Sequence, residues 1–295
     1  MKTQLTLLLS LFIFFGLSAQ TDTSKWEFDG MTSLNFSQVA LTNWNGGGNN
    51  AVSLATLTKL NLNRKHSKYT FTNSLTLAYG LQQIEDQDVR KTDDRIEFVS
   101  EYSRKAFKKW NYLSNFTFRS QFDKGFAFPN DSTQVLISDF MAPGYFLLSI
   151  GLNREINENL KVTISPISGK LTVVNNDTLS AAGAFGVDPG KKTRLEAGAS
   201  FRMVYKKEVF KNVTYNTALD LFSNYVENPQ NIDVNWDNII DFKINNFLSV
   251  NFSLLMIYDD DIDIPIDSND DGILDKSGPR AQWKQTFNLG LQVKF

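Results

Sequence analysis

The C-terminal segment, residues 283–295, has a hydropathy period of two. One parity carries Trp283, Phe287, Leu289, Leu291, Val293 and Phe295, and the other carries Lys284, Thr286, Asn288, Gly290, Gln292 and Lys294. Successive side chains of a β-strand point to opposite faces, so this segment predicts a strand with one apolar and one polar face. Such a strand fits the wall of a lipid-embedded barrel, and it also fits an amphipathic sheet of a soluble protein.

The N-terminal segment predicts export from the cytoplasm. Lys2 precedes an apolar run over residues 5–17, which closes on Ser18, Ala19 and Gln20, with small residues where a signal peptidase cuts. The run is shorter than the roughly 20 residues of a membrane-spanning helix. We therefore expect a signal peptide at 1–20 and one mature domain at 21–295. The sequence has no cysteine, which leaves no lipid-anchor site and no disulfides.

Alternating segments of strand length recur along the mature chain. Twelve are expected, at residues 28–41, 52–62, 69–81, 96–107, 110–122, 140–152, 162–174, 195–205, 213–225, 234–244, 248–258 and 283–295. Pro166 and Gly169 interrupt the seventh segment, where the apolar parity slips, and they predict a β-bulge.

The connections between these segments alternate in length. Every second connection is a short turn, at residues 64–67, 108–109, 155–159, 206–211 and 245–246, and the others are longer loops. Short periplasmic turns, long outer loops and both termini on the periplasmic side are typical of bacterial outer-membrane barrels. We therefore expect an all-β fold, a single antiparallel transmembrane β-barrel of about twelve strands in the outer membrane.

Composition is compatible with this fold and argues against several functions. Charged residues make up 21% of the chain, as in a soluble protein, because only alternate residues of a barrel strand face lipid. The net charge of −2 gives no reason to expect a nucleic-acid partner. His66 is the only histidine and lies in a charged turn, so histidine-based catalysis is disfavoured and we expect no enzyme.

Strand parity also assigns charged residues to the lumen. The thirteen positions are Arg95, Glu97, Glu101, Lys105, Arg119, Arg194, Glu196, Arg202, Asp220, Asp233, Asp237, Asp241 and Lys243. Both signs occur in similar number, so we expect ion pairs that fill a narrow lumen. Tryptophan and tyrosine residues fall near segment ends, where interfacial girdles belong. They are Trp26, Trp44, Tyr69, Trp110, Tyr205, Tyr225, Trp236, Tyr258 and Trp283.

The last long loop contains a motif typical of calcium sites. Asp267, Asn269, Asp271 and Asp275 supply oxygen donors, and Gly272 stands at the position of the sharp turn. Position twelve is glycine rather than glutamate, so the motif is not an EF-hand; it is similar to the abbreviated loops of dockerins and thrombospondin-type repeats. Further ligands are available from Asp259, Asp260, Asp261 and Asp263. The alternative is a solvated acidic loop without metal.

Four features in order carry a family resemblance. They are residues 41–44 (Leu-Thr-Asn-Trp) with the following glycines, 138–145 (Ser-Asp-Phe-Met-Ala-Pro-Gly-Tyr), 164–166 (Ile-Ser-Pro) and the Asp-rich loop before the final strand. With these, the chain resembles DUF3078, a Bacteroidetes outer-membrane β-barrel family of unknown function. The resemblance to outer-membrane barrels implies that the barrel assembly machinery recognises the strand ending at Phe295. It implies nothing about a substrate.

The functional expectation is a non-enzymatic outer-membrane β-barrel. Paired inward charges favour a structural or accessory barrel that presents extracellular loops to envelope partners. The alternative is a narrow porin-like channel for small solutes, and an outer-membrane enzyme is the least favoured class. The expected partners are outer-membrane lipid, the assembly machinery and other outer-membrane subunits.

Overall fold

Twelve long antiparallel strands close into a barrel in the computed structural model, which describes residues 26–41, 49–130, 133–266 and 275–295. Around the barrel the strands follow the order β1-β16-β13-β12-β11-β10-β9-β8-β5-β4-β3-β2. Their bounds are β1 (Trp26–Val39), β2 (Ala51–Lys65), β3 (Tyr69–Ile84), β4 (Arg90–Lys105), β5 (Asn111–Ser120), β8 (Gly144–Asn157), β9 (Leu160–Val173), β10 (Thr193–Phe210), β11 (Val213–Asn224), β12 (Ile232–Lys243), β13 (Leu248–Tyr258) and β16 (Gln282–Lys294). The predicted fold class and all twelve strands are confirmed.

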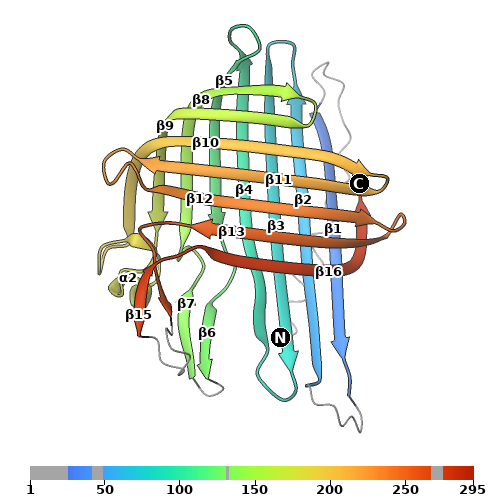
Figure 1. Cartoon of the computed structure of the whole chain (residues 1–295), viewed down its shortest axis with the longest axis vertical. Helices are drawn as coiled ribbons and strands as arrows, with labels where there is room; N and C mark the ends of the chain where they lie inside the picture. Colours follow the sequence, from blue (N-terminus) through green and yellow to red (C-terminus); the bar gives the residue numbers. More distant parts are fainter. Residues whose placement is uncertain (1–25, 42–48, 131–132, 267–274) are drawn as a thin grey trace.

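The strands of the two walls cross at a steep angle in Figure 1, where β10 to β13 run in front of β1 to β4. Closure of a sheet into a barrel requires this tilt of the strands. The signal peptide predicted for residues 1–20 lies outside the described residues. Within the described ranges, no helix is long and apolar enough to cross a membrane.

The outer surface of the barrel is an apolar belt. In β16, Phe287 is 70% exposed and Val293 is 60% exposed, whereas Gly290 on the opposite parity is buried. The same alternation exposes Leu34 and Phe36 in β1. Soluble monomers rarely expose an apolar surface of this extent, so the outward parity identifies the barrel as a transmembrane one of the outer-membrane type.

The predicted bulge in the seventh barrel strand is confirmed. The pairing of β8 with β9 shifts between Ile150 and Leu152, and the pairing of β10 with β9 shifts between Gly198 and Ser200. Gly151 packs directly against the bulge, because a Cβ atom there would lie 2.1 Å from the Ile164 carbonyl oxygen. A residue with a side chain at this position would push the two strands apart.

Several long loops contain short elements that the periodicity did not predict. These are the hairpin of β6 (Gly125–Asn130) and β7 (Thr133–Ser138), helix α2 (Asp177–Ala181), the 3-10 turn η1 (Ala184–Gly186) and the hairpin of β14 (Asp263–Ile266) and β15 (Lys276–Pro279). The labelled elements β6, β7, α2 and β15 gather at the end opposite the short turns, the lower end in Figure 1. We call this end the loop end and the other the turn end.

The sixth barrel strand begins at Gly144 rather than at residue 140. Asp139 and Ala142 exchange two backbone hydrogen bonds of 2.8 and 2.9 Å, which close a tight turn immediately before the strand. Pro143 has no backbone N–H to donate to a sheet ladder. The turn and the proline therefore delay the start of regular pairing.

The junction between the first and last strands is much shorter than its neighbours. The register of β1 with β16 contains the pairs from Met31↔Lys294 to Asn35↔Gly290. Reciprocal backbone hydrogen bonds between Gly30 and Phe295, at 2.8 and 3.0 Å, extend it by one residue. On its other side, β1 pairs with β2 along the whole strand, Trp26–Val39. The barrel therefore closes at this seam over its turn-end half only.

Candidate functional site: a lumen crossed by ion pairs

A network of four charged side chains crosses the middle of the lumen. Arg119 on β5 donates from Nε to Glu97 Oε1 at 2.7 Å and from Nη2 to Asp220 Oδ2 at 3.0 Å. Arg202 on β10 donates from Nη1 to both carboxylate oxygens of Asp220 at 2.9 Å. Because β8, β9 and β10 lie between β5 and β11 in the barrel, these bonds cross the lumen between non-adjacent parts of the wall. We call Glu97, Arg119, Asp220 and Arg202 the central belt.

A second ion pair spans the full width of the barrel. Arg95 Nη1 on β4 lies 3.3 Å from Asp237 Oδ2 on β12. Five strands separate β4 from β12 in either direction around the closed sheet. Direct contact between opposite walls shows that the lumen is narrow at this level.

The loop end of the lumen contains a cluster of carboxylates around Lys170. The Lys170 ammonium lies 2.7 Å from Asp233, 3.3 Å from Glu196 and 3.4 Å from Asp259. Glu196 is only 4% exposed, so its charge is stable only with such a partner. The Lys170 ammonium also lies 5.2 Å from the centre of the Phe222 ring, within cation–π range. Polar and aromatic side chains therefore occupy this end too.

A small cap formed by the loops that precede β8 and follow β9 lies at the loop end. Ala142, Val174, Leu179 and Val187 are all buried and pack into one hydrophobic cluster. Asn176 caps α2, because its Oδ1 accepts hydrogen bonds from the backbone N–H of residues 178 and 179 at 3.1 and 3.2 Å. The loop after β9 is thus an ordered surface rather than an extended linker.

An ion pair lies on the solvent side of this cap. Lys192 Nζ lies 2.8 Å from Asp177 Oδ1. The hydrogen bond from Lys192, together with its charge, lowers the pKa of Asp177 below its usual value. Both side chains are largely exposed, so the pair orients the loop surface without contributing much stability.

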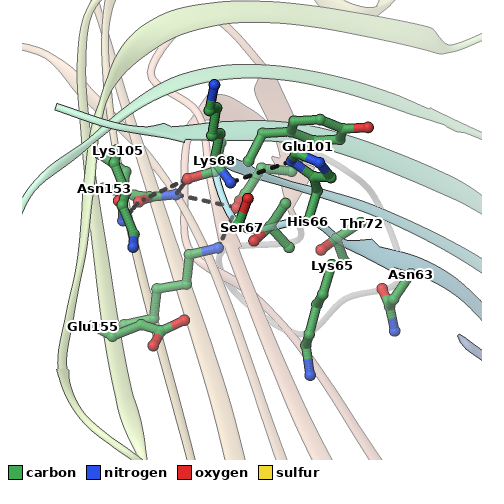
Figure 2. A pocket seen from close by; sticks show the side chains of 15 residues that line it. Asn63, Lys65, His66, Ser67, Lys68, Thr72, Glu101, Lys105, Asn153 and Glu155 are labelled. Carbon is green, nitrogen blue, oxygen red and sulfur yellow. Dashed lines mark hydrogen bonds and ion pairs between the residues drawn. The ribbon is translucent and has the colours of Figure 1, made fainter. Parts of the chain in front are cut away.

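A polar cavity of about 300 Å³ lies at the turn end. Glu101 and Asn153 are among the side chains that line it (Figure 2), and Asn153 Nδ2 donates to Glu101 Oε1 at 3.2 Å. Glu101 also accepts a hydrogen bond from Lys161. We call this cavity, lined among others by Asn63, Lys65, His66, Glu101, Lys105, Asn153, Glu155 and Lys161, the turn chamber.

His66 lies on the rim of the turn chamber and is engaged in local contacts. Its ring stacks on Tyr69 with centroids 4.8 Å apart, and its Nδ1 accepts a hydrogen bond from the backbone N–H of Lys68 at 3.3 Å. A general base must reach the proton that it abstracts. The geometry of the only histidine therefore gives no support to acid–base catalysis.

A second cavity of about 320 Å³ lies beside the seam between β1 and β16. Along β4 its lining ends at Arg95, and the lining of the turn chamber begins at Glu101. Glu97 of the central belt stands between these two residues, hydrogen-bonded to Arg119. We call the second cavity the seam chamber. The central belt separates it from the turn chamber.

Strand parity predicted the lumen-facing charges well. Ten of the thirteen predicted residues form ion pairs, namely Arg95, Glu97, Glu101, Arg119, Arg194, Glu196, Arg202, Asp220, Asp233 and Asp237. The sequence reasoning missed the lumen residues Lys59, Lys161 and Lys170. Parity could have found Lys59, whose neighbours in the second segment alternate, whereas the bulge at Pro166 hid Lys170.

The predicted calcium motif is largely outside the described residues. Asp267, Asn269 and Asp271 lie outside the described residues, and Asp275 immediately precedes β15. Three of the four further acidic residues, Asp259, Asp260 and Asp261, have protein partners in the structure. Asp259 pairs with Lys170, Asp261 Oδ2 lies 2.6 Å from Arg194 Nη2, and Asp260 accepts hydrogen bonds from Asn231 and Tyr258. These contacts neutralise part of the acidic loop without a metal.

The aromatic positions agree in part with the predicted girdles. At the turn end, Trp26 packs edge-on against Phe71 with centroids 6.2 Å apart, and Tyr69 stacks on Tyr102 at 5.6 Å. Trp236 is different, because it lies inside β12, paired with Leu219 and Met256. Its indole N–H donates to Thr217 Oγ1 at 2.9 Å, which satisfies the donor within the wall.

Comparison with known proteins supports the family resemblance over part of the chain. The model of the family described as "Protein of unknown function (DUF3078)" matches residues 36–126, from the end of β1 into β6. The curated proteins contain no match.

Several solved barrels are similar to the chain at low identity. The translocator domain of autotransporter NalP from Neisseria meningitidis is 9% identical with a TM-score of 0.37, covering 100% of this chain and 95% of that one. The COG4313 outer membrane channel from Pseudomonas putida F1 is 12% identical with a TM-score of 0.40, covering 95% and 100%. Salmonella typhi OmpF, in complex with daunomycin, is 10% identical with a TM-score of 0.30, covering 95% and 100%. The barrel fold of this chain rests on its own strand pairing.

Proposed function

We propose that the protein is an exported outer-membrane barrel of the DUF3078 family, with a closed lumen, that acts as a structural or accessory component of the envelope. The apolar outward face fits a bilayer, and the strand ending at Phe295 is the element that we assign to recognition by the assembly machinery. The ordered cap and hairpins of the loop end are the surface offered to other envelope components.

The observation that carries this proposal is the central belt. Its bonds join β5, β4, β11 and β10 across the lumen, and the Arg95–Asp237 pair joins opposite walls next to it. A diffusive channel needs a continuous water path, with groups that bind a solute weakly enough to release it. A lumen crossed by mutually satisfied ion pairs is poorly suited to either requirement at this level.

The narrow-channel alternative also has one supporting observation. The turn chamber and the seam chamber lie on either side of the belt, with volumes of about 300 and 320 Å³. Movement of the belt would join them into one path. The accessory barrel and the narrow channel therefore differ in whether the central belt stays in place across the lumen.

Single-channel recording in planar bilayers tests the proposal. We expect the purified protein to give no steady conductance, and the variant with both Arg95→Ser and Arg119→Ser to conduct. Arg154→Ser is the matched control, because Arg154 lies outside the lumen with its guanidinium 5.9 Å from the Trp110 ring centre. A steady conductance of the unmodified protein, unchanged in the double variant, would establish the channel function instead.

A further inference from the structure

We propose that the gap in the wall between β1 and β16 is a lateral binding site for an anionic single-chain amphiphile, which places its head in the seam chamber and its tail in the bilayer. The proposal is independent of the accessory function above. It rests on the short seam, on the residues that line the seam chamber and on the charge inside it.

The seam is open over its loop-end half. The last paired residues are Asn35 and Gly290, and no β-pairing joins residues 36–39 of β1 to residues 282–289 of β16, all of which are described. Gly290 is the last residue of close contact toward the loop end, because a Cβ atom there would lie 2.1 Å from Asn35 Oδ1. Beyond this point the two strands have only their other neighbours, β2 and β13.

The lining of the seam chamber shows that it passes through the wall. Ser33, Asn35 and Thr286 have lumen-facing parity, whereas Phe36 and Phe287 have lipid-facing parity, and all five line the same cavity. An intact β-wall keeps these two sets of side chains on opposite sides. A cavity that touches both sets must therefore connect the lumen with the outer surface.

The outer rim of this opening is apolar. Phe36 is 57% exposed, Phe287 is 70% exposed, and Leu289 beside them is 51% exposed. They lie in the part of the wall that faces lipid. An acyl chain that leaves the opening would continue to contact apolar surface on its way into the bilayer.

The inside of the seam chamber is polar and carries an unpaired cation. Its charged lining residues are the cations Lys59, Arg95 and Lys284 and the carboxylates Asp93 and Asp237, three positive against two negative. Arg95 is paired with Asp237, and Lys284 with Asp93.

Of the three cations that line the seam chamber, Lys59 is the one without a carboxylate partner among the described residues. Within the described residues, no hydrogen bond or ion pair engages its ammonium group, although Asp237 and Asp241 are near enough to act on its charge. A partly buried ammonium that lacks a direct partner favours an anionic ligand. A carboxylate or a phosphate head satisfies this requirement equally well.

The volume sets a limit on the part of the ligand that enters. About 320 Å³ lies at the lower end of the range for small-molecule sites, so a compact head with one chain fits better than a large lipid head. An added peptide strand is the other chemistry that an unpaired strand edge could accept. The lumenal cation and the apolar rim favour the amphiphile.

The test measures binding of radiolabelled dodecanoate to the mature chain in nanodiscs of zwitterionic lipid, with empty nanodiscs subtracted. The chain has no cysteine, so disulfides can be placed at will. Ser37→Cys with Asn288→Cys continues the observed register into the open half and closes it on oxidation. Ser33→Cys with Gln292→Cys is the matched control, because these two residues are already paired.

We expect oxidation of the 37/288 pair to weaken dodecanoate binding at least tenfold, with recovery on reduction, and oxidation of the 33/292 pair to change it less than twofold. Ala55→Trp fills the seam chamber and should abolish binding even where no disulfide forms. Heat-modifiable migration on gels confirms that each variant is folded. Equal binding with the open half closed and with the chamber filled would overturn the proposal.

The head group is tested separately. Lys59→Met should weaken binding about tenfold and Lys59→Arg should retain it, while Lys105→Met in the turn chamber serves as a control lysine. Dodecyl phosphate should compete with dodecanoate, and the relative strength of the two competitors distinguishes a phosphate from a carboxylate ligand. Equal competition by uncharged dodecanol, or stable capture of an extended peptide without dodecanoate binding, would refute an anionic amphiphile as the occupant.

Discussion

Replacing Arg119 by methionine should destabilise the barrel more than removal of any exposed cation. Arg119 is 31% exposed in its side chain, and its partners Glu97 and Asp220 are 18% and 24% exposed. Removing one partner of a fully buried pair costs about 3–5 kcal/mol. Partial exposure of these three groups to lumenal water reduces this, and we expect a loss of about 2–3 kcal/mol in the free energy of unfolding.

The loss of stability in Arg119→Met falls unequally on Glu97 and Asp220, because the two carboxylates keep different partners. Asp220 keeps both hydrogen bonds from Arg202 at 2.9 Å, whereas Glu97 loses the guanidinium that lies 2.7 Å away. The uncompensated charge is therefore at Glu97. Adding Glu97→Gln to Arg119→Met should restore about 1 kcal/mol, since the neutral amide costs less to keep in the lumen.

Reversible urea unfolding of the refolded barrel, followed by tryptophan fluorescence, measures both variants. Lys65→Met is the control, because Lys65 and its partner Glu27 are 3.5 Å apart and 71% and 56% exposed; its cost should be about 0–1 kcal/mol. A loss below about 0.5 kcal/mol for Arg119→Met, with no recovery on adding Glu97→Gln, would show that the belt sits in bulk-like water. The argument for a closed lumen would then fail.

Three further predictions concern topology, assembly and the acidic loop. A cysteine at Thr178 should react with an impermeant thiol reagent on intact cells and one at Asn157 should not; the reverse pattern would invert the topology. Deleting Phe295 removes its two backbone hydrogen bonds to β1 and should lower membrane levels while the refolded barrel stays heat-modifiable; unchanged levels would argue against recognition of this residue. Titration should detect calcium binding at about 0.1–1 mM, lost on replacing Asp267 and Asp271 by alanine; no binding to the unmodified chain would leave a solvated acidic loop.

The strands were predictable from sequence because the physical rule behind them is local. A wall between lipid and lumen requires alternation at every strand, so parity alone locates both the strands and their lumen-facing residues. The β14–β15 hairpin and α2 follow no such rule. Their formation depends on particular contacts, such as the Asn176 cap and the packing of Leu179 against Val187, which no periodicity reveals.

Parity assigns a residue to a face but not to a partner. It placed both Arg95 and Asp237 in the lumen, yet their contact depends on the separation of β4 and β12 around the closed sheet. Parity also could not predict where the pairing of β1 with β16 stops, since the alternation in residues 283–295 continues without change past Gly290. Where the pairing stops is a property of barrel geometry rather than of either strand.

The position of the seam chamber accounts for the short seam between β1 and β16, because unpaired strand edges need a polar neighbour. Backbone N–H and C=O groups that lack a partner are expensive in hydrocarbon and are tolerated where they line a polar cavity. The unpaired edges of residues 36–39 and 282–289 border such a cavity, lined by Asn35, Ser37 and Asn288. A barrel with a fully packed lumen could not leave its wall open at this position. The central belt leaves room for a polar pocket on each side, and the one beside the seam lies where the wall needs one.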